Sequence, residues 1–388
     1  MDICVLNQFF YPYNGGTEKV LFEVYRRMAK RHNITVITSA PLHSKKNIVE
    51  EIEGITVLRL RSTHIDIPVS PLPFVAMPGL NSAIKKARCE LYHINNRYQY
   101  FGDNVAAIRK VNGKIALTIH NSLPIGIDPA IDSLGLVYDI TWGRILMHEA
   151  DLLTGVSRNT INTTVPIKDI SKAHLVYNGV DHNIFRPIDR DDAGVKAVAR
   201  SLGDECGSND ANIITNGRLI DQKGQIYLMR AVANLANEGL KLGLLTIGKG
   251  PLEKKLVSEA ESLGLRDRFW IRNGIAEEKL PDYYNFCDMF ALPSLYEPAG
   301  LVVLEALACE LPSIASSVGG IPEMLDGYGL YAQPKSVEEL EDRIGYVLKN
   351  RKKMAAMAKR GRKFVVERHD WDKIVKRYEK LFMDTLHY

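Results

Sequence analysis

The amino-acid sequence predicts an α/β protein built from two doubly wound domains, and three observations support this fold class. Short apolar runs alternate with stretches of helical spacing along the chain, which is typical of parallel sheets covered by helices on both faces. The alternation stops at the polar stretch from Arg186 to Asp210 and then restarts. The length of 388 residues also exceeds what one hydrophobic core usually supports.

The first domain is predicted to span residues 1–183, with a hinge near residues 181–190. Four prolines between Ile65 and Leu80 predict an extended loop, because proline and the residue before it resist helix formation. Such a long loop on a compact domain is often functional. The expected strands are the apolar runs Ile3–Leu6, Ile34–Thr38, Thr56–Leu60, Leu91–Ile94, Ile115–Ile119, Leu152–Val156 and His174–Tyr177.

The second domain is predicted to span residues 184–370. Beyond it, residues 371–388 place four large apolar side chains on one helical face, so we expect a helix that packs on a neighbouring element. The expected strands of the second domain are Ile213–Asn216, Leu242–Ile247, Phe269–Arg272, Met289–Leu292, Ser313–Ala315 and Leu330–Tyr331.

Composition excludes several classes of protein. The chain is 46% hydrophobic and 25% charged, as in ordinary globular proteins, and its net charge of +4 argues against a dedicated nucleic-acid binder. The five cysteines are scattered and contain no Cys-x-x-Cys, so neither disulfides nor a zinc site is expected. No apolar run reaches the length of a membrane span, and no signal peptide is recognisable. We therefore expect a cytoplasmic protein.

Two glutamates, Glu297 and Glu305, flank a predicted helix start. The apolar run before them predicts a strand, and the spacing of the apolar residues after Gly300 predicts a helix. Unpaired N–H groups at such a helix start attract phosphate, while a carboxylate one turn inside can hold the hydroxyls of a sugar. The pair is equally explained by an acid at a helix start and an exposed helical glutamate.

A second cluster of charged residues follows the first strand of the second domain. Gly217 and Gly224 permit a tight loop in which Arg218 and Lys223 supply two cations, the groups needed to hold a diphosphate. The next strand ends in Gly248-Lys-Gly-Pro, which is not a Gly-x-Gly-x-x-Gly fingerprint. Since neither half contains that fingerprint, a dehydrogenase is disfavoured.

The first domain places other candidates after its strands. Gly15 and Gly16 follow the first strand, where a doubly wound sheet binds ligands, although an ordinary strand-to-helix turn explains them as well. His120 follows the strand that ends at Ile119. A single histidine is more often structural than catalytic, but this location favours a role in the site.

Taken together, these residues resemble those of the retaining nucleotide-sugar glycosyltransferases of the GT-B fold, in the large family that includes sucrose synthases, bacterial glycogen synthases and bacterial mannosyltransferases. The resemblance covers almost the whole chain. It rests on five features: Gly15-Gly16, His120, Asn178-Gly-Val-Asp181, the Arg218 to Gly224 loop, and Glu297-x7-Glu305 followed by Gly319-Gly320.

The resemblance implies two Rossmann-like domains that face each other across a cleft, the last helix returning to the first domain. It also implies a role for each candidate residue. Arg218, Lys223, His120 and Glu297 would be the catalytic set, and Glu305 would hold the ribose hydroxyls. The remaining donor contacts would come from Gly15 and Gly16, from Gly274 and Ile275 at the base, and from the helix start at Ala299, Gly300, Leu301 and Val302.

The implied reaction is transfer of a sugar, a hexose in most such enzymes, from a UDP- or GDP-sugar to a glycan, lipid or small-molecule acceptor. No cofactor or metal is implied, because Arg218 and Lys223 supply the charge. Two Asp-x-Asp matches, Asp189-Arg-Asp191 and Asp370-Trp-Asp372, lie near predicted domain crossings and are read as chance. The acceptor is expected to meet first-domain loops, including Pro68–Pro78 and Asn95–Phe101.

Three alternatives stay open at this point. A non-hydrolysing nucleotide-sugar epimerase shares the architecture, although the Glu297-x7-Glu305 pair argues against it. An inactive nucleotide-sugar-binding subunit would keep the binding residues without turnover. Basic residues of the first domain, such as Lys85-Lys86, leave room for a peripheral membrane contact, but solvated helix faces explain them equally well; the same applies to the basic stretch from Arg351 to Lys363.

Overall fold

The computed structural model describes residues 1–13, 15–42, 44, 46–65, 73–122 and 129–387. These residues form two compact units, one of Met1–Asn178 with Trp371–Tyr388 and the other of Gly179–Asp370. The boundary follows Asn178 rather than residue 183, because Val180 forms a parallel bridge with Asp370 and donates its N–H to the carbonyl of His369 at 2.8 Å. We call the two parts unit 1 and unit 2.

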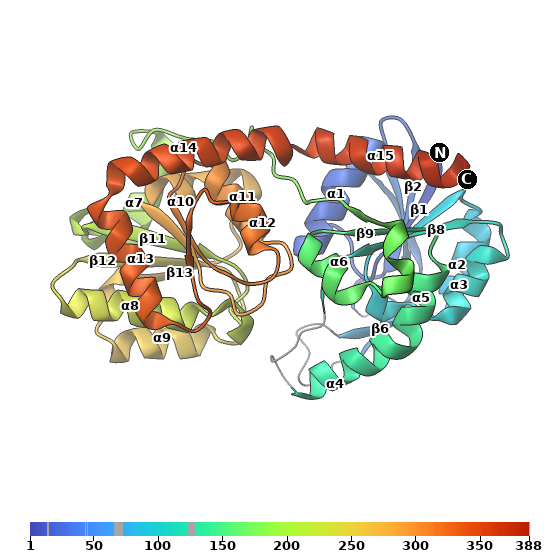
Figure 1. Ribbon diagram of the computed structural model, residues 1–388, viewed down its shortest axis with the longest axis horizontal. Helices are drawn as coiled ribbons and strands as arrows, with labels where there is room; N and C mark the ends of the chain where they lie inside the picture. The colour runs from blue at the N-terminus through green and yellow to red at the C-terminus, as the bar shows by residue number, and fades with distance from the viewer. Residues whose placement is uncertain (14, 43, 45, 66–72, 123–128, 388) are drawn as a thin grey trace. The chain divides into compact units, whose positions relative to one another are not determined.

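Unit 1 is built on an eight-stranded sheet (Figure 1). All neighbouring strands are parallel except β3 and β4, which are antiparallel. From one edge to the other the strands are β10 (Ala173–Leu175), β9 (Leu152–Gly155), β8 (Lys114–Ile119), β7 (Leu91–Ile94), β1 (Asp2–Leu6), β2 (Asn33–Ser39), β4 (Ile55–Leu60) and β3 (Ile48–Ile52).

Three strands of unit 1 were not expected from the sequence. β3 is an edge strand with no buried residue, so it carries no apolar pattern. β5 (Thr63–Ile65) and β6 (Phe74–Ala76) form a short antiparallel pair. The expectation of an extended loop from Ile65 to Leu80 was therefore wrong for β6, which lies between Pro73 and Pro78; residues 66–72 of that loop lie outside the described residues.

Seven α-helices of the described part of unit 1 accompany this sheet. The last of them packs on the first: Arg31 Nη2 donates to Glu379 Oε1 at 2.7 Å, and Arg27 Nε donates to Asp372 Oδ1 at 3.2 Å. The helices are α1 (Gly16–Met28), α2 (Leu80–Ala87), α3 (Gly102–Arg109), α4 (Pro129–Tyr138), α5 (Arg144–Glu149), α6 (Arg158–Thr164) and α15 (Trp371–His387), with a π-helical turn at Asp139–Gly143 and 3-10 turns at Arg97–Gln99 and Ile167–Lys172.

Unit 2 is built on a six-stranded sheet in which every neighbouring pair is parallel. Its order, counted along the chain, is 3-2-1-4-5-6, the order of a Rossmann domain. Across the sheet the strands are β13 (Phe269–Arg272), β12 (Leu242–Ile247), β11 (Ala211–Asn216), β14 (Met289–Leu292), β15 (Ser313–Ser316) and β16 (Leu330–Ala332). The predicted class of two doubly wound α/β units is confirmed.

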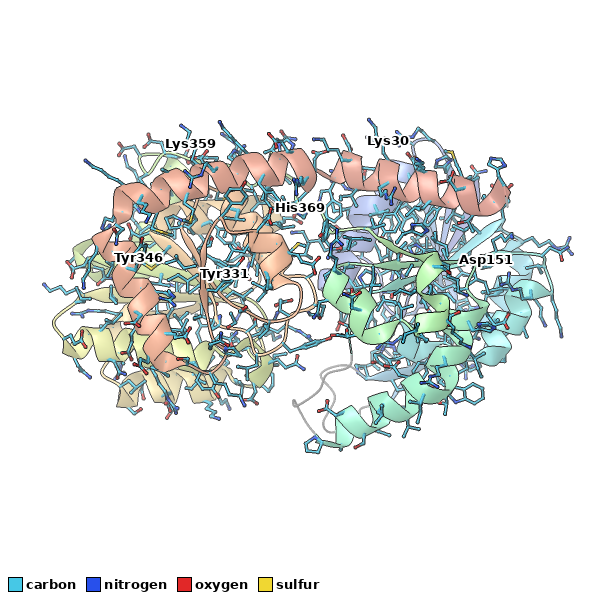
Figure 2. All side chains as sticks on the ribbon, in the orientation of Figure 1. Lys30, Asp151, Tyr331, Tyr346, Lys359 and His369 are labelled. Carbon is cyan, nitrogen blue, oxygen red and sulfur yellow. The ribbon has the colours of Figure 1, made fainter. Side chains whose placement is uncertain are left out.

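Helices of unit 2 cover both faces of its sheet (Figure 1). On the basic helix α14, Met354 and Phe364 are buried, whereas Lys359 lies on the exposed side (Figure 2). The helices are α7 (Ala193–Leu202), α8 (Gln225–Asn237), α9 (Glu253–Ser262), α10 (Leu280–Phe286), α11 (Leu301–Ala308), α12 (Ile321–Leu325), α13 (Val337–Lys349) and α14 (Arg351–Arg368), with 3-10 turns at Asp204–Ser208, Asp221–Lys223, Arg266–Arg268 and Glu277–Lys279.

Each sheet has one point where the order of strands reverses. In unit 1 the chain builds outward from β1 through β2 and then crosses back to β7; in unit 2 it builds from β11 through β12 and crosses back to β14. Loops that leave the carboxyl ends of such neighbouring strands diverge and form the crevice in which doubly wound sheets bind ligands. The fold therefore indicates β1/β7 and β11/β14 as the places to look for a site.

Two further features concern the whole described chain. All five cysteines are buried, and none of them forms a disulfide. None of the helices in the described ranges combines the length and the apolar character that crossing a membrane requires.

Candidate functional site

The loops after β11 and β14 are joined to each other in unit 2. The N–H of Leu295 donates to the carbonyl of Gln222 at 2.7 Å. Gly224 packs against the carbonyl of Pro293 so closely that a Cβ would overlap its oxygen, and its φ of +64° lies in the left-handed region. Glycine is required at this position, and the contact brings the loop of Lys223 next to the loop of Glu297.

Lys223 and Glu297 form an ion pair at this junction. The Lys223 ammonium donates to Glu297 Oε2, and the two side chains are only 18% and 11% exposed. Ser294 Oγ lies 3.5 Å from the same carboxylate oxygen. The lysine cation and the carboxylate thus offset each other's charge in a partly dry site. The structure thus brings together two residues that the sequence placed in separate motifs.

Glu305 is buried on α11, with an exposed fraction of 4%. The Tyr284 hydroxyl on α10 donates to Glu305 Oε2 at 2.9 Å. The reading of Glu305 as an exposed helical glutamate does not hold. A buried carboxylate needs hydrogen-bond donors to offset its lost hydration, and one of them is Tyr284.

The helix start between the two glutamates has the geometry of an anion site. Gly300 is the N-cap of α11 in the left-handed conformation, at φ +78°. Because no side chain caps this end, the first N–H groups of the helix, including those of Leu301 and Val302, have no carbonyl partner within the helix. Ala299 and Gly300 are buried, and no acidic residue lies in the first turn.

The turn at Gly319-Gly320 braces the loop that carries Glu297. The N–H of Gly320 donates to the carbonyl of Glu297 at 3.0 Å. Gly319 has φ +55°, and a Cβ on it would overlap the same carbonyl oxygen. This explains why a pair of glycines follows the helix: the turn must approach the Glu297 backbone closely.

Two predicted donor contacts lie at the same sheet edge without joining this cluster. Arg218 follows β11, and its backbone carbonyl accepts a hydrogen bond from Gln225 Nε2 at 2.9 Å. The Arg218 side chain is exposed and makes no ion pair with a described residue. Gly274 and Ile275 follow β13, two strands away from β11, and Gly274 is exposed with φ +67°. These positions leave both groups accessible to a ligand.

In unit 1, Gly15 caps α1 and Gly16 is its first residue. A Cβ on Gly15 would overlap the Glu18 carboxylate, whose Oε1 accepts a hydrogen bond from Asn7 Nδ2 at 3.3 Å. Asn7 directly follows β1. The glycine pair therefore starts a helix at the β1/β7 switch point, as the sequence predicted for its position.

His120 follows β8 and is 8% exposed. Its Nε2 lies 3.3 Å from Asn95 Oδ1, the residue that follows β7. Burial lowers the pKa of His120 to about 4, so near neutral pH the imidazole is uncharged and acts as a hydrogen-bonding group rather than a cation.

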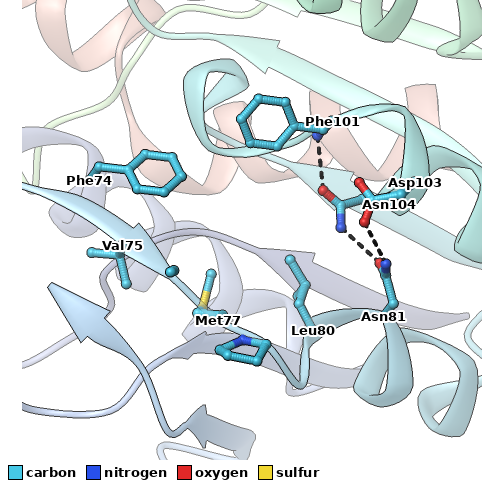
Figure 3. Close-up of a pocket in the computed structure, with 10 residues that line it drawn as sticks. Phe74, Val75, Met77, Leu80, Asn81, Phe101, Asp103 and Asn104 are labelled. Carbon is cyan, nitrogen blue, oxygen red and sulfur yellow. Dashed lines mark hydrogen bonds between the residues drawn. The ribbon is translucent and has the colours of Figure 1, made fainter. Parts of the chain in front are cut away.

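A pocket of about 180 Å³ opens at the starts of α2 and α3 (Figure 3). Both helices flank β7, one before and one after it, so they begin at the carboxyl edge of the sheet. The rings of Phe74 and Phe101 meet edge to face at 6.5 Å. Asn81 joins Asp103 and Asn104 by hydrogen bonds of 2.7 and 2.8 Å. The pocket thus combines two aromatic rings with a polar rim.

No group of three or more His, Cys, Asp or Glu side chains in the described ranges is arranged to hold a metal. The acids of the Asp-x-Asp matches have local partners instead. Asp189 accepts from the N–H of Asp191, which pairs with Lys196 at 2.9 Å. Asp370 pairs with His182 at 2.9 Å.

Sequence reasoning missed Tyr284 and Ser294 as parts of this site, and also Asn216, whose Nδ2 donates to the Tyr284 hydroxyl oxygen at 3.1 Å. A tyrosine among apolar helix residues carries the same pattern as a core tyrosine, so periodicity could not single it out. Ser294 was adjacent to the motif and could have been found from its position three residues before Glu297. Asn216 directly precedes the Gly217-Arg218 loop.

Two doubly wound units, one of which holds a buried acid pair, a lysine and an uncapped helix start at its switch point, are the features of the GT-B class of glycosyltransferases. Comparison with known proteins agrees. The model of the family "Glycosyltransferase Family 4" matches residues 14–184, and the model "Glycosyl transferases group 1" matches residues 207–364. The chain belongs to the family-four-type glycosyltransferases of the GT-B fold.

Similar proteins include a GDP-mannose-dependent phosphatidylinositol monomannoside mannosyltransferase of Mycolicibacterium smegmatis, 32% identical over 59% of this chain and 61% of the relative. The N-acetyl-α-D-glucosaminyl L-malate synthase of Bacillus anthracis is 25% identical over 97% of this chain and 96% of its own. Among solved structures, Anabaena HepE in complex with UDP and glucose matches with a TM-score of 0.78 at 20% identity, over 99% of both chains. This last likeness concerns the fold. The chain is a glycosyltransferase.

Proposed function

We propose that the protein transfers a hexose, with retention of anomeric configuration, from a UDP- or GDP-sugar to an acceptor held by unit 1. The observation that carries this proposal is the cluster at the β11/β14 switch point, in which buried Glu297 and Glu305 flank an uncapped helix start and Lys223 lies beside Glu297. Such a cluster offers N–H groups and a cation to a diphosphate and carboxylates to sugar hydroxyls.

The charge distribution matches what the reaction needs. Breaking the bond between the anomeric carbon and the phosphate oxygen leaves negative charge on the diphosphate and positive charge on the sugar ring. Lys223, Arg218 and the start of α11 stabilise the negative charge on the diphosphate. The Glu297 carboxylate accepts hydrogen bonds from the sugar and lies near the positive charge on the sugar ring. In a same-face reaction the acceptor oxygen bonds to the anomeric carbon while its proton passes to the departing phosphate oxygen.

The proposed donor contacts divide the nucleotide sugar into parts. Glu305 accepts hydrogen bonds from the ribose hydroxyls, the N–H groups at Gly300 to Val302 meet the diphosphate, and Gly274 and Ile275 lie beside the base. Among the relatives, one is named as GDP-mannose-dependent and one solved structure contains UDP and glucose. Both kinds of donor therefore belong in the first tests.

The acceptor is proposed to bind at the carboxyl edge of the unit 1 sheet. The pocket in Figure 3 is lined by residues of the two segments that the sequence marked for the acceptor, 68–78 and 95–101, through Phe74 to Pro78 and Phe101. Aromatic faces beside carboxylate and amide groups suit a molecule that carries both hydroxyls and an apolar face. His120, uncharged and at the same edge, is suited to hydrogen-bond a sugar hydroxyl.

A peripheral contact of unit 1 with a membrane surface is also proposed. Eight of the sixteen large hydrophobic side chains that are exposed in the described residues lie between residues 134 and 170, on α4, the π-helical turn, α5 and the 3-10 turn after α6. In unit 2 the exposed large hydrophobics of the described residues comprise Val257 alone. Unit 1 also contains 24 Lys and Arg against 18 Asp and Glu, which favours an anionic surface.

The deciding experiment measures thermal stabilisation and nucleotide release with a panel of UDP- and GDP-sugars. A true donor at 100 times its dissociation constant stabilises the folded protein by about 2.7 kcal/mol, and with an acceptor it releases UDP or GDP. Conversion of a nucleotide sugar without acceptor and without release of nucleotide would support an epimerase instead. Tight binding without turnover across acceptors would support a binding subunit.

A further inference from the structure

Three residues from three elements of unit 2 form a hydrogen-bonded chain that ends on Glu305. Asn216, the last residue of β11, donates from Nδ2 to the Tyr284 hydroxyl oxygen at 3.1 Å. The Tyr284 hydroxyl donates to Glu305 Oε2 at 2.9 Å. Tyr284 is fully buried on α10, and Glu305 is 4% exposed on α11. The chain crosses the switch point where the donor cluster lies.

The direction of this chain is fixed by its chemistry. An ionised carboxylate only accepts hydrogen bonds, so the single hydroxyl proton of Tyr284 must point at Glu305. The tyrosine oxygen then accepts from the Asn216 amide. Burial, together with the nearby Glu305 charge, raises the pKa of Tyr284 well above its usual value of 10, so the hydroxyl keeps its proton near neutral pH.

Packing holds the tyrosine ring in place. The ring meets Phe185 at 6.0 Å in an edge-to-face contact and Phe290 at 6.0 Å at a tilt. Both phenylalanines are fully buried. A ring fixed on two sides presents its hydroxyl at one point, and the Glu305 oxygen that accepts from this hydroxyl is held at that point.

We propose that Tyr284 is a positioning residue that fixes the Glu305 carboxylate for the ribose of the donor, with Asn216 as its support. The inference rests on the proposed function. Tyr284 touches no substrate in this arrangement; it acts through Glu305 by holding one carboxylate oxygen in place while the carboxylate meets the two ribose hydroxyls. The consequence is selectivity for ribose over a nucleotide that lacks those hydroxyls.

The test compares Tyr284→Phe with Tyr283→Phe, a change of the same kind at the half-buried neighbour on α10. Calorimetry gives the dissociation constants of UDP and GDP and of their 2′,3′-dideoxy forms. The unmodified protein is expected to prefer the ribose form at least about 10-fold, as for hydrogen bonds to a charged group. Tyr284→Phe should narrow this preference about 3- to 10-fold, chiefly through weaker binding of the ribose form, while Tyr283→Phe keeps it.

Other outcomes contradict the proposal in distinguishable ways. If Tyr284→Phe weakens binding of the ribose and dideoxy forms by the same factor, or keeps the full preference for the ribose form, Tyr284 is structural. The positioning role is then wrong, while the donor site stands. If the unmodified protein shows no preference for ribose, the assignment of Glu305 in the proposed function fails and the role of Tyr284 fails with it. If Tyr284→Phe does not fold, Asn216→Ala is used in its place. This variant should reduce the preference for the ribose form by a smaller factor, and an unchanged preference would contradict the proposal.

Discussion

Lys223 and Glu297, which lie 74 residues apart in the chain, form an ion pair at the point where the strand order of unit 2 reverses. Each residue comes from a separate loop, and the backbone bond between Leu295 and Gln222 holds the loops together. Because both side chains are mostly buried, the charge of each is offset mainly by the other. The same two groups are proposed to bind opposite ends of the reacting bond.

A single and a double variant of this ion pair should therefore separate its effect on stability from its effect on activity. Lys223→Met is expected to lower kcat/KM by at least about 100-fold, the usual effect of losing one preorganised charge partner, and to destabilise the fold by about 1–3 kcal/mol because Glu297 loses its counter-charge. The double variant Lys223→Met/Glu297→Leu should recover most of the stability and none of the activity. Steady-state kinetics and urea unfolding measure both effects; near-normal turnover in Lys223→Met would refute the site.

Gly319 offers a test of the turn that braces Glu297. In Gly319→Ala the new methyl group would overlap the Glu297 carbonyl in a left-handed conformation, so we expect a loss of about 1–3 kcal/mol in the free energy of unfolding and a marked loss of transfer activity. Gly345→Ala is the matched control, because nothing lies within 4 Å of its new methyl group on α13. It should be neutral or stabilising by about 0.5–1 kcal/mol. Equal effects of the two substitutions would contradict the argument.

The sequence predicted the buried parallel strands well, because strands covered on both faces are continuous apolar runs. β12 (Leu242–Ile247) and β14 (Met289–Leu292) begin and end where predicted. β3 was missed because its side chains are exposed at the sheet edge. The sequence could place Glu297 and Lys223 in loops after strands and Glu305 on the helix that follows, since helical and strand periods fix where these elements begin and end.

What the sequence could not supply is pairing between distant loops. Nothing in the motif around Glu297 indicates that its carboxylate meets Lys223 rather than Arg218, because that depends on the Gly224 contact with Pro293. The partner of Glu305 was equally hidden, since Tyr284 resembles a core residue. The roles of the site residues and the facing of the two domains across a cleft stay predictions.

Two buried histidines in unit 1 predict how stability depends on pH. Burial lowers the pKa of His93 to about 3, with a smaller effect of His120, and the pKa of His120 to about 4. The unfolded chain, with ordinary values near 6.5, binds more protons, so the free energy of unfolding falls as pH drops below about 6.5. His93 alone should account for about 2 kcal/mol between pH 7 and pH 5.

Urea unfolding at pH 7 and pH 5 measures this fall. His93→Gln should show a smaller decrease than the unmodified protein, whereas His387→Gln, a change at an exposed position near the end of α15, should show the same decrease. If the three proteins lose stability in parallel, carboxylates rather than the buried histidines govern the acid side.

Activity is expected to survive an excess of chelator. Lys223, Arg218 and the uncapped start of α11 provide positive charge for the leaving diphosphate, so no divalent ion is needed in the proposed mechanism. The measurement is kcat/KM with and without EDTA, after dialysis. Activity that disappears with chelator and returns on adding magnesium or manganese would contradict metal independence.

The apolar surface of α4 and of the π-helical turn that follows it predicts binding to lipid vesicles. Leu134, Val137 and Ile140 are 61%, 57% and 52% exposed, and a helix with so many exposed apolar side chains gains free energy when it enters a lipid interface. We expect the protein to sediment with vesicles that contain phosphatidylglycerol and much less with phosphatidylcholine alone. Replacing the three residues by serine should abolish sedimentation, whereas Val257→Ser, a change of an exposed apolar residue in unit 2, should not. Unchanged sedimentation of the triple variant would exclude this surface as the contact.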